Sequence, residues 1–289
     1  MAIATPLSTS GRFIVDAHGN RVRLAGVNWY GASENEGVPV GLDVIHRNQL
    51  AELIASFGFN CVRLPFSAWM TEQTAPVPGQ NEPRPATVGG RLLNPTWGLG
   101  DQTDFSVMYT SIGNVIHQLN PHLLIICEGL GYATHLEGVA THPVRLAAAN
   151  KVVYSMHDYS WFHPQGQTEA AYAQSMNAAG GYLLTEKIAP LWIGEFGDNV
   201  SSLAASPGGI SWWANIQAWL TDSDVDWCWW ALNPVHGNSC DPGTSTPKYT
   251  WGQPEPYGLL TSDWANAAYL SVISMLQAMM HPRTGPGVP

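Results

Sequence analysis

Charged residues are scarce in this sequence, since only 12% of its 289 residues are Asp, Glu, Lys or Arg. Lys and Arg together number 12 against 22 Asp and Glu, which gives a formal net charge of -10. A chain with so few cations is poorly suited to bind nucleic acid or an anionic membrane surface, so we expect neither as a partner. Hydrophobic residues reach 45%, which excludes a disordered chain and predicts a sizeable buried core.

Motifs that mark several other classes of enzyme are also missing. No C-x-x-C and no H-E-x-x-H occurs, so we expect no metal site. The glycine patterns of nucleotide-binding folds, G-x-G-x-x-G and the P-loop, are absent, and so is the G-x-S-x-G of serine hydrolases. The sequence shows neither a signal-peptide pattern nor an apolar stretch of about 18 residues, so we expect no membrane span.

Cysteine is rare, with four residues at Cys61, Cys127, Cys228 and Cys240. Three of them lie in or beside apolar runs, which favours buried free thiols. Cys228 and Cys240 could also pair across a loop. The low lysine content and one glycosylation motif, Asn199-Val200-Ser201, fit a secreted protein, and we therefore expect an extracellular location.

Apolar runs and helical periods alternate along most of the chain. The expected core strands are residues 25–30, 60–65, 123–128, 152–159, 191–195 and 227–232. The expected helices are residues 43–57, 103–119, 168–186, 209–221 and 263–280. The helix over 103–119 carries its apolar residues on one side: Phe105, Val107, Met108, Ile112, Val115 and Ile116. Before these elements we expect a hairpin in which Phe13–Val15 and Val22–Leu24 flank a turn.

Strands followed by helices predict parallel pairing with right-handed crossovers. A TIM-type (β/α)8 barrel and a doubly wound sheet both fit this order, and both place a site at the carboxyl ends of the strands. The missing nucleotide motifs favour the barrel. No segment has the composition of a linker, so we expect a single catalytic domain over residues 1–289.

Polar residues follow the expected strands, and the clearest case is Glu195 in Leu191–Gly197. Taken alone, Glu195 could equally be a strand-end partner in an ion pair. Retaining glycoside hydrolysis needs two carboxyl groups about 5–5.5 Å apart, one as nucleophile and one as acid and then base. Glu195 and Glu82 are the candidates for these two roles. Thirteen Trp and ten Tyr would supply flat faces for sugar rings.

The order of motifs resembles glycoside hydrolase family 5, especially its fungal endoglucanase-like members. The motifs, in order, are GRFIVDAHGNRVRLAGVNWYG, FGFNCVRLPFS, NEP, HDY, WIGEF and WCWWALNP. This resemblance covers almost the whole chain. It implies a retaining endo-β-1,4-glucanase, or cellulase, that acts on β-glucan without a metal or cofactor.

The resemblance also implies roles for individual residues. Glu195 would be the nucleophile and Glu82 the acid/base. Arg63 would keep the nucleophile ionised, Tyr159 would donate to it, and His157 would lie near the acid/base. The other substrate-binding candidates are Asn81 on the sugar 2-hydroxyl, Trp230 or its neighbour Trp229 as the stacking platform, and Trp29. Glu128 also ends a strand, but the family pattern gives it no comparable role.

Structural roles remain open for several of these residues. Arg63 could be the partner in a buried ion pair, His157 a hydrogen-bonded histidine at a strand end, and Trp230 a core residue.

The family pattern breaks before NEP. In the family, two helices and a histidine-bearing strand precede it, whereas here only 15 residues separate Pro65 from Asn81. We therefore expect a truncated barrel of about six strands, with the third and fourth missing. Strands 60–65 and 122–128 must then pair directly or leave open edges, and a homo-oligomer could cover such an edge. The alternative function is a catalytically impaired family member that binds glucan without efficient turnover.

Overall fold

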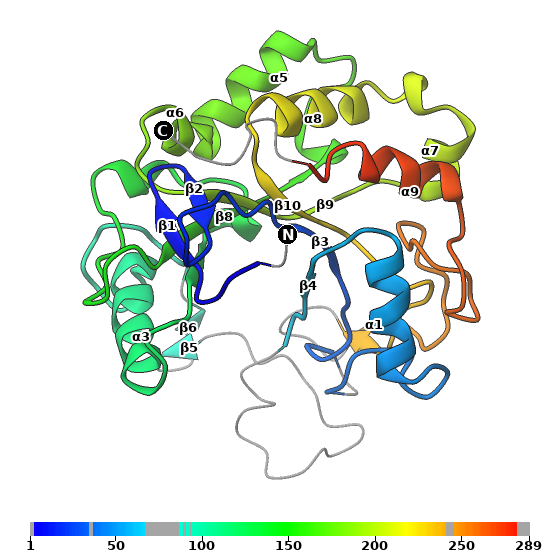
Figure 1. Ribbon diagram of the computed structural model, residues 1–289, viewed down its shortest axis with the longest axis horizontal. Helices are drawn as coiled ribbons and strands as arrows, with labels where there is room; N and C mark the ends of the chain where they lie inside the picture. Colours follow the sequence, from blue (N-terminus) through cyan, green and yellow to red (C-terminus); the bar gives the residue numbers. More distant parts are fainter. Residues whose placement is uncertain are drawn as a thin grey trace.

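The computed structural model describes residues 3–34, 37–66, 87–88, 91–92, 94–240 and 246–281. Six parallel strands form the central sheet, in the spatial order β4-β3-β10-β9-β8-β7 (Figure 1). They are β3 (Ala25–Asn28), β4 (Cys61–Arg63), β7 (Ile125–Glu128), β8 (Val152–Tyr159), β9 (Leu191–Gly197) and β10 (Asp226–Trp229). These are the six strands expected from the sequence, and the curled sheet is a half-barrel of the TIM type.

The sheet is open within the described part of the chain, because no strand there pairs with the outer edge of β4 or β7. The two end strands do not pair with each other either. Their carboxyl ends are nevertheless joined by an ion pair, in which Arg63 Nη2 lies 2.8 Å from Glu128 Oε1. In the described sheet, the expected truncation therefore leaves the outer edges of β4 and β7 open, with this ion pair between their carboxyl ends.

Helices cover the outer face of the sheet and separate its strands. The longer ones are α1 (Arg47–Ser56), α3 (Phe105–Leu119), α5 (Glu169–Met176), α8 (Ser211–Asp222) and α9 (Leu270–Gln277). Shorter helices are α4 (Leu130–Ala133), α6 (Tyr182–Thr185) and α7 (Val200–Ala205). Three two-stranded sheets are also described, in which β1 (Ser8–Ser10) pairs with β2 (Phe13–Val15), β5 (Thr87–Val88) with β6 (Arg91–Leu92), and β11 (Ser239–Cys240) with β12 (Pro247–Tyr249). The helix expected over 168–186 is interrupted by a π-helical turn at Asn177–Gly181.

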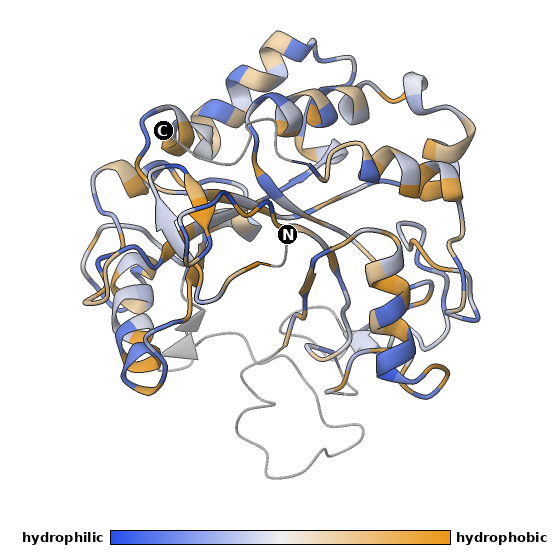
Figure 2. Cartoon of the chain, viewed as in Figure 1, coloured by the Kyte–Doolittle hydropathy of each residue, from blue (hydrophilic) through white to orange (hydrophobic). Residues whose placement is uncertain are grey.

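Helix α3 begins close to where its sequence predicts, but only part of its apolar side is buried. Asp104 caps the helix by accepting a hydrogen bond from the Ser106 amide. Ile112 and Val115 are 51% and 57% exposed, and apolar residues are visible on α3 in Figure 2. Ile116 packs against the core, but an apolar stripe normally packs along its whole length, so the described residues leave part of the apolar side of α3 uncovered.

The hairpin is not formed by the strands that the sequence suggested. Strand β2 pairs antiparallel with β1, whereas Val22–Leu24 contributes only a short contact with β2. The carboxylate of Asp16 accepts hydrogen bonds from the amides of His18 and Asn20, which closes a tight turn. The chain after this turn then follows β10, where Trp227 donates its amide hydrogen to the Leu24 carbonyl.

The last helix is shorter than expected, because α9 begins at Leu270 rather than near residue 263. Asp263 accepts hydrogen bonds from the Thr261 hydroxyl and the Ala265 amide, and this favours a turn over a helix. Trp264 is buried with a φ of 61°, outside the helical region.

The core has two layers, one on each face of the sheet. The outer layer lies between sheet and helices and includes Phe196, Trp227 and Trp229. The inner layer combines the N-terminal segment with strand residues that point into the half-barrel: Ile14, Val22, Leu24, Val153, Trp192 and Cys228. Cys61, Cys127 and Cys228 are free thiols, so the pairing of Cys228 with Cys240 is wrong.

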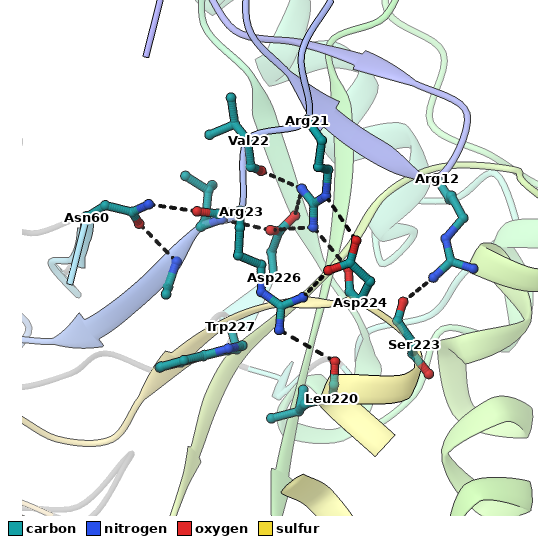
Figure 3. A network of polar contacts seen from close by, with 12 residues as sticks. Arg12, Arg21, Val22, Arg23, Asn60, Leu220, Ser223, Asp224, Asp226 and Trp227 are labelled. Carbon is teal, nitrogen blue, oxygen red and sulfur yellow. Dashed lines mark hydrogen bonds and ion pairs between the residues drawn. The ribbon is translucent and has the colours of Figure 1, made fainter. Parts of the chain in front are cut away.

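Buried ion pairs fasten the N-terminal segment to β10 (Figure 3). Arg21 donates two hydrogen bonds to Asp226, with Nη2–Oδ1 and Nη1–Oδ2 distances of 2.8 and 3.1 Å. Arg23 Nη1 lies 2.7 Å from Asp224 Oδ1. Asp226 is 1% exposed and also accepts the Leu24 amide at 2.8 Å. These contacts explain why residues 21–24 leave β2.

Replacing Asp226 with Asn should lower the free energy of unfolding by about 3–5 kcal/mol, because Arg21 would remain buried with half of its counter-charge removed. The exposed Asp43→Asn variant serves as the control and should change stability by about 0.5 kcal/mol or less. Urea denaturation of both variants measures the difference. Equal stabilities would show that the network does not hold the segment in place.

Candidate active site

A β-bulge in β9 directs Glu195 into the half-barrel. Consecutive residues Met156 and His157 of β8 pair with Ile193 and Glu195, so Gly194 is left over. The pairing of β9 with β10 shifts in the same region. Side chains alternate along a regular strand, and one extra residue reverses that phase. The bulge therefore lets Glu195 point to the inner face.

The glycines around Glu195 allow close approach of neighbouring strands. A Cβ atom on Gly194 would lie 2.7 Å from the Ser155 hydroxyl oxygen. A Cβ atom on Gly197 would overlap the carbonyl oxygen of Trp230. The two glycines thus keep β9 close to β8 and to the segment that carries Trp230.

Arg63 and Tyr159 each donate a hydrogen bond to a different oxygen of the Glu195 carboxylate. Arg63 Nη1 donates to Oε1 at 2.6 Å, and the Tyr159 hydroxyl donates to Oε2 at 2.8 Å. Asn28 accepts a further hydrogen bond from Arg63 Nη1 at 2.8 Å. Burial alone would lower the pKa of Arg63, but the charges of Glu195 and Glu128 outweigh it and raise the pKa. Burial also raises the pKa of Tyr159, which therefore stays a donor.

Glu128 occupies the other side of Arg63. Its Oε1 atom accepts a hydrogen bond from Arg63 Nη2 at 2.8 Å and lies 3.4 Å from His157 Nε2, a long contact. Burial raises the pKa of Glu128, but His157 and Arg63 outweigh this effect and lower the pKa to about 2. His157 also places Nδ1 3.5 Å from Glu195 Oε2. Arg63 and His157 therefore lie between two carboxyl groups.

These side chains line a cavity of about 1540 Å³ with aromatic residues on its walls. Trp230 is half-buried and stacks on Tyr30, with ring centroids 4.8 Å apart. Trp161 is 58% exposed and stacks on Tyr159 at 4.3 Å. The cavity thus combines a fixed carboxylate with flat apolar surfaces, a combination suited to sugar rings.

The structure brings together most of the residues that the sequence singled out: Arg63, His157, Tyr159, Glu195 and Trp230 all line the cavity. Trp229 is fully buried and donates its indole N–H to the Tyr257 carbonyl, so Trp230 is the one of the pair that faces the cavity. Trp29 does not line it, and instead donates to the Val40 carbonyl and packs on the core. Glu82 and Asn81 lie outside the described residues.

Several cavity residues were not found by sequence reasoning, among them Tyr30, Trp161, His236, Glu255 and Tyr257. Trp161 lies two residues after the HDY motif, and this position beyond a strand end could have drawn attention to it. Glu255 and His236 lie beyond the last expected strand in a segment without a periodic pattern.

In the described part of the chain, metal-ion clusters and membrane-spanning helices are both absent. No group of three His, Cys, Asp or Glu side chains there is arranged to hold a metal ion. None of the helices described here is both long enough and apolar enough to pass through a membrane.

Comparison with solved structures shows the same fold. The endocellulase of Pyrococcus horikoshii, in complex with cellotetraose, has a TM-score of 0.70 at 19% identity, covering 97% of this chain and 100% of that one. The major endoglucanase of Xanthomonas campestris pv. campestris has a TM-score of 0.70 at 18% identity, covering 95% and 99%.

Comparison with characterised sequences adds two relatives. An endoglucanase of Paenibacillus polymyxa is 24% identical over 351 aligned positions, which cover 89% of this chain and 82% of that protein. A glycosyl hydrolase 5 family protein of Chamaecyparis obtusa is 26% identical over 381 positions, covering 97% and 67%. Both alignments are longer than the 289 residues of this chain, so each relative has residues that this chain lacks.

The family description "Cellulase (glycosyl hydrolase family 5)" matches residues 77–236, more than half of the chain. This match includes the strand that carries Glu195 and the aromatic segment at Trp230. The chain therefore belongs to glycosyl hydrolase family 5, a family of glycoside hydrolases.

Proposed function

We propose that this protein is a retaining endo-β-1,4-glucanase that cleaves β-glucan by double displacement. The observation that carries the proposal is the position of Glu195, held by Arg63 and Tyr159 inside a large aromatic cavity. Endoglucanases among the relatives and the cellotetraose complex of a structural neighbour support a cellulose-like substrate. Residues 1–289 would form one catalytic domain of an extracellular enzyme.

Glu195 is the proposed nucleophile. Attack on the anomeric carbon requires an ionised carboxylate, and a guanidinium 2.6 Å from Oε1 favours that form. The hydrogen bond from the Tyr159 hydroxyl occupies one lone pair of Glu195 Oε2 and fixes the orientation of the carboxylate plane. Arg63 and Tyr159 therefore act on Glu195 rather than on the sugar.

Glu82 is the proposed acid/base, with Asn81 on the sugar 2-hydroxyl, both on the strength of the NEP motif. Glu128 is the rival candidate because it lies at the same cavity beside Arg63 and His157. A pKa of about 2 makes Glu128 a carboxylate at neutral pH, so it has no proton to give to the leaving group. This argument favours Glu82.

Trp230 is the proposed stacking platform for a glucosyl ring, with His157 as a further substrate-binding residue, whereas the position of Trp29 away from the cavity does not support that role for it. The half-buried indole of Trp230 faces the cavity, and its neighbour Trp229 does not. The alternative function, binding of glucan without efficient turnover, rests on the open sheet. Arg63 stands on an end strand, and a displacement of about 1 Å at a catalytic group can cost on the order of 10²-fold in rate.

Release of reducing sugar from carboxymethyl-cellulose tests the two-carboxylate mechanism. Glu195→Gln should lose nearly all activity, and Glu82→Gln should lose on the order of 10²–10⁴-fold because the leaving group is no longer protonated. The exposed and distant Glu186→Gln variant should keep wild-type activity. A normal rate in Glu82→Gln together with an inactive Glu128→Gln would move the acid/base role to Glu128. An inactive, folded wild type that still binds glucan would support the alternative function.

The contacts of Glu128 with His157 and Arg63 should make stability depend on pH. The folded-state pKa of Glu128 is about 2, below the ordinary value of 4.5, so the unfolded chain takes up the proton first as the pH falls. The stability from this group is therefore complete above about pH 4.5 and is lost toward pH 2. Because the Glu128 carboxylate is 38% exposed, solvent screening reduces the size of this contribution to stability. Urea denaturation of wild type and Glu128→Gln from pH 2 to 6 should show the wild-type advantage shrinking with acid, and a constant difference would contradict the pairing.

A second copy of the chain is proposed to cover the open side of the half-barrel. The uncovered part of the apolar side of α3 and the outer face of β4, where Val62 is 38% exposed, are the surfaces left for it. Light scattering should then give a mass above the 31.3 kDa of one chain at micromolar concentration. A monomer at all concentrations, combined with cooperative thermal unfolding, would exclude this arrangement.

A further inference from the structure

The cavity wall beside Trp230 contains a cluster of buried polar residues, Tyr30, His236 and Glu255, to which the proposed reaction assigns no role. Tyr30 is 2% exposed and stacks on Trp230 with a centroid distance of 4.8 Å and an interplanar angle of 7°. One face of the Trp230 ring is therefore covered by a buried tyrosine. The orientation of Trp230 depends on how firmly Tyr30 is held.

Tyr30 is held at its hydroxyl by two buried side chains. The hydroxyl donates to Glu255 Oε2 at 2.9 Å and lies 2.9 Å from His236 Nδ1. Burial lowers the pKa of His236 to about 4, so the imidazole is neutral at neutral pH. Burial also raises the pKa of Tyr30, so the phenol keeps its proton for Glu255.

The members of this cluster are fixed in turn by their own contacts. Glu255 accepts the Tyr257 amide at 3.0 Å, and His236 stacks on Tyr249 with centroids 3.8 Å apart. The backbone of Tyr30 is tied to Asn233, which accepts its amide at 3.2 Å and donates to its carbonyl at 3.1 Å. Asn233 is fully buried and lies three residues after Trp230.

We propose that Tyr30 is a positioning residue that fixes the ring plane of Trp230, and that Glu255 and His236 hold Tyr30 in that orientation. Tyr30 borders the cavity beside the indole, but it is only 2% exposed, so its contact with Trp230 is the one through which we expect it to act. A glucosyl ring that stacks on Trp230 needs the indole in one plane, and a preorganised ring avoids the entropy of ordering it on binding. This inference rests on the proposed role of Trp230 as the sugar platform.

Tyr30→Phe is the decisive substitution, because it keeps the stacked ring and removes only the hydroxyl. Binding of cellotetraose, measured by calorimetry in the Glu195→Gln protein, should weaken by about 3- to 10-fold, the size of one net hydrogen bond. With the active enzyme, KM should rise by a similar factor while kcat changes less. Glu255→Gln keeps an acceptor oxygen and should give a smaller effect.

Tyr172→Phe is the matched control. Tyr172 is also a buried tyrosine that donates to a buried carboxylate, Asp158, at 2.7 Å, but it lies in the outer layer of the core. This variant should lower thermal stability and leave cellotetraose binding unchanged. Equal weakening by Tyr172→Phe would mean that Tyr30 acts only through general stability, and would overturn the proposal.

A double-mutant cycle with Trp230→Ala separates this inference from the function on which it rests. If Tyr30 acts through Trp230, Tyr30→Phe should weaken binding no further once Trp230 is Ala. Undiminished weakening in that background, or unchanged binding in Tyr30→Phe and Glu255→Gln alone, would overturn the positioning role. Unchanged binding in Trp230→Ala alone would instead show that Trp230 is not the platform, which refutes the proposed function at this residue and the inference with it.

Discussion

The geometry of the cavity depends on one guanidinium that is shared by two carboxylates. Arg63 donates to Glu195 at 2.6 Å and to Glu128 at 2.8 Å, and these two acids stand on strands that are not neighbours in the sheet. The charges of Glu195 and Glu128 offset the cost of burying the arginine. The same contact fixes the nucleophile candidate and connects the two end strands.

The backbone supplies what this contact needs. The bulge in β9 turns Glu195 inward, and Gly194 and Gly197 let the neighbouring segments come close enough to surround it. Tyr159 reaches Glu195 from β8, while Trp230 follows β10 on the other side. Each side chain comes from the carboxyl end of a different strand, which is how a parallel sheet assembles one site from distant parts of a chain.

Local patterns predicted the strands and the acid at the end of β9, because burial of apolar runs is a property of the segment itself. They failed where distant partners decide the structure. Residues 21–24 leave the hairpin because Arg21 and Arg23 bind acids about two hundred positions away. The pairing of Tyr30 with Glu255 spans 225 positions, so the strand expected to end at Tyr30 gives no sign of its partner. The phase of the bulge was equally hidden, since one extra residue leaves the composition of a strand unchanged.

The strands that carry the site differ in how many neighbouring strands hold them in the described sheet. Glu195 stands on β9, which has a partner on both sides, whereas Arg63 stands on β4, which has only β3 in the described sheet. An end strand with one partner opens more readily than a central one, because fewer hydrogen bonds hold it. The ion pair to Glu128 adds a second attachment at the point where Arg63 must stay within reach of Glu195. Glu128 has no part in the proposed reaction, but its ion pair with Arg63 therefore compensates for the strands that the described half-barrel lacks.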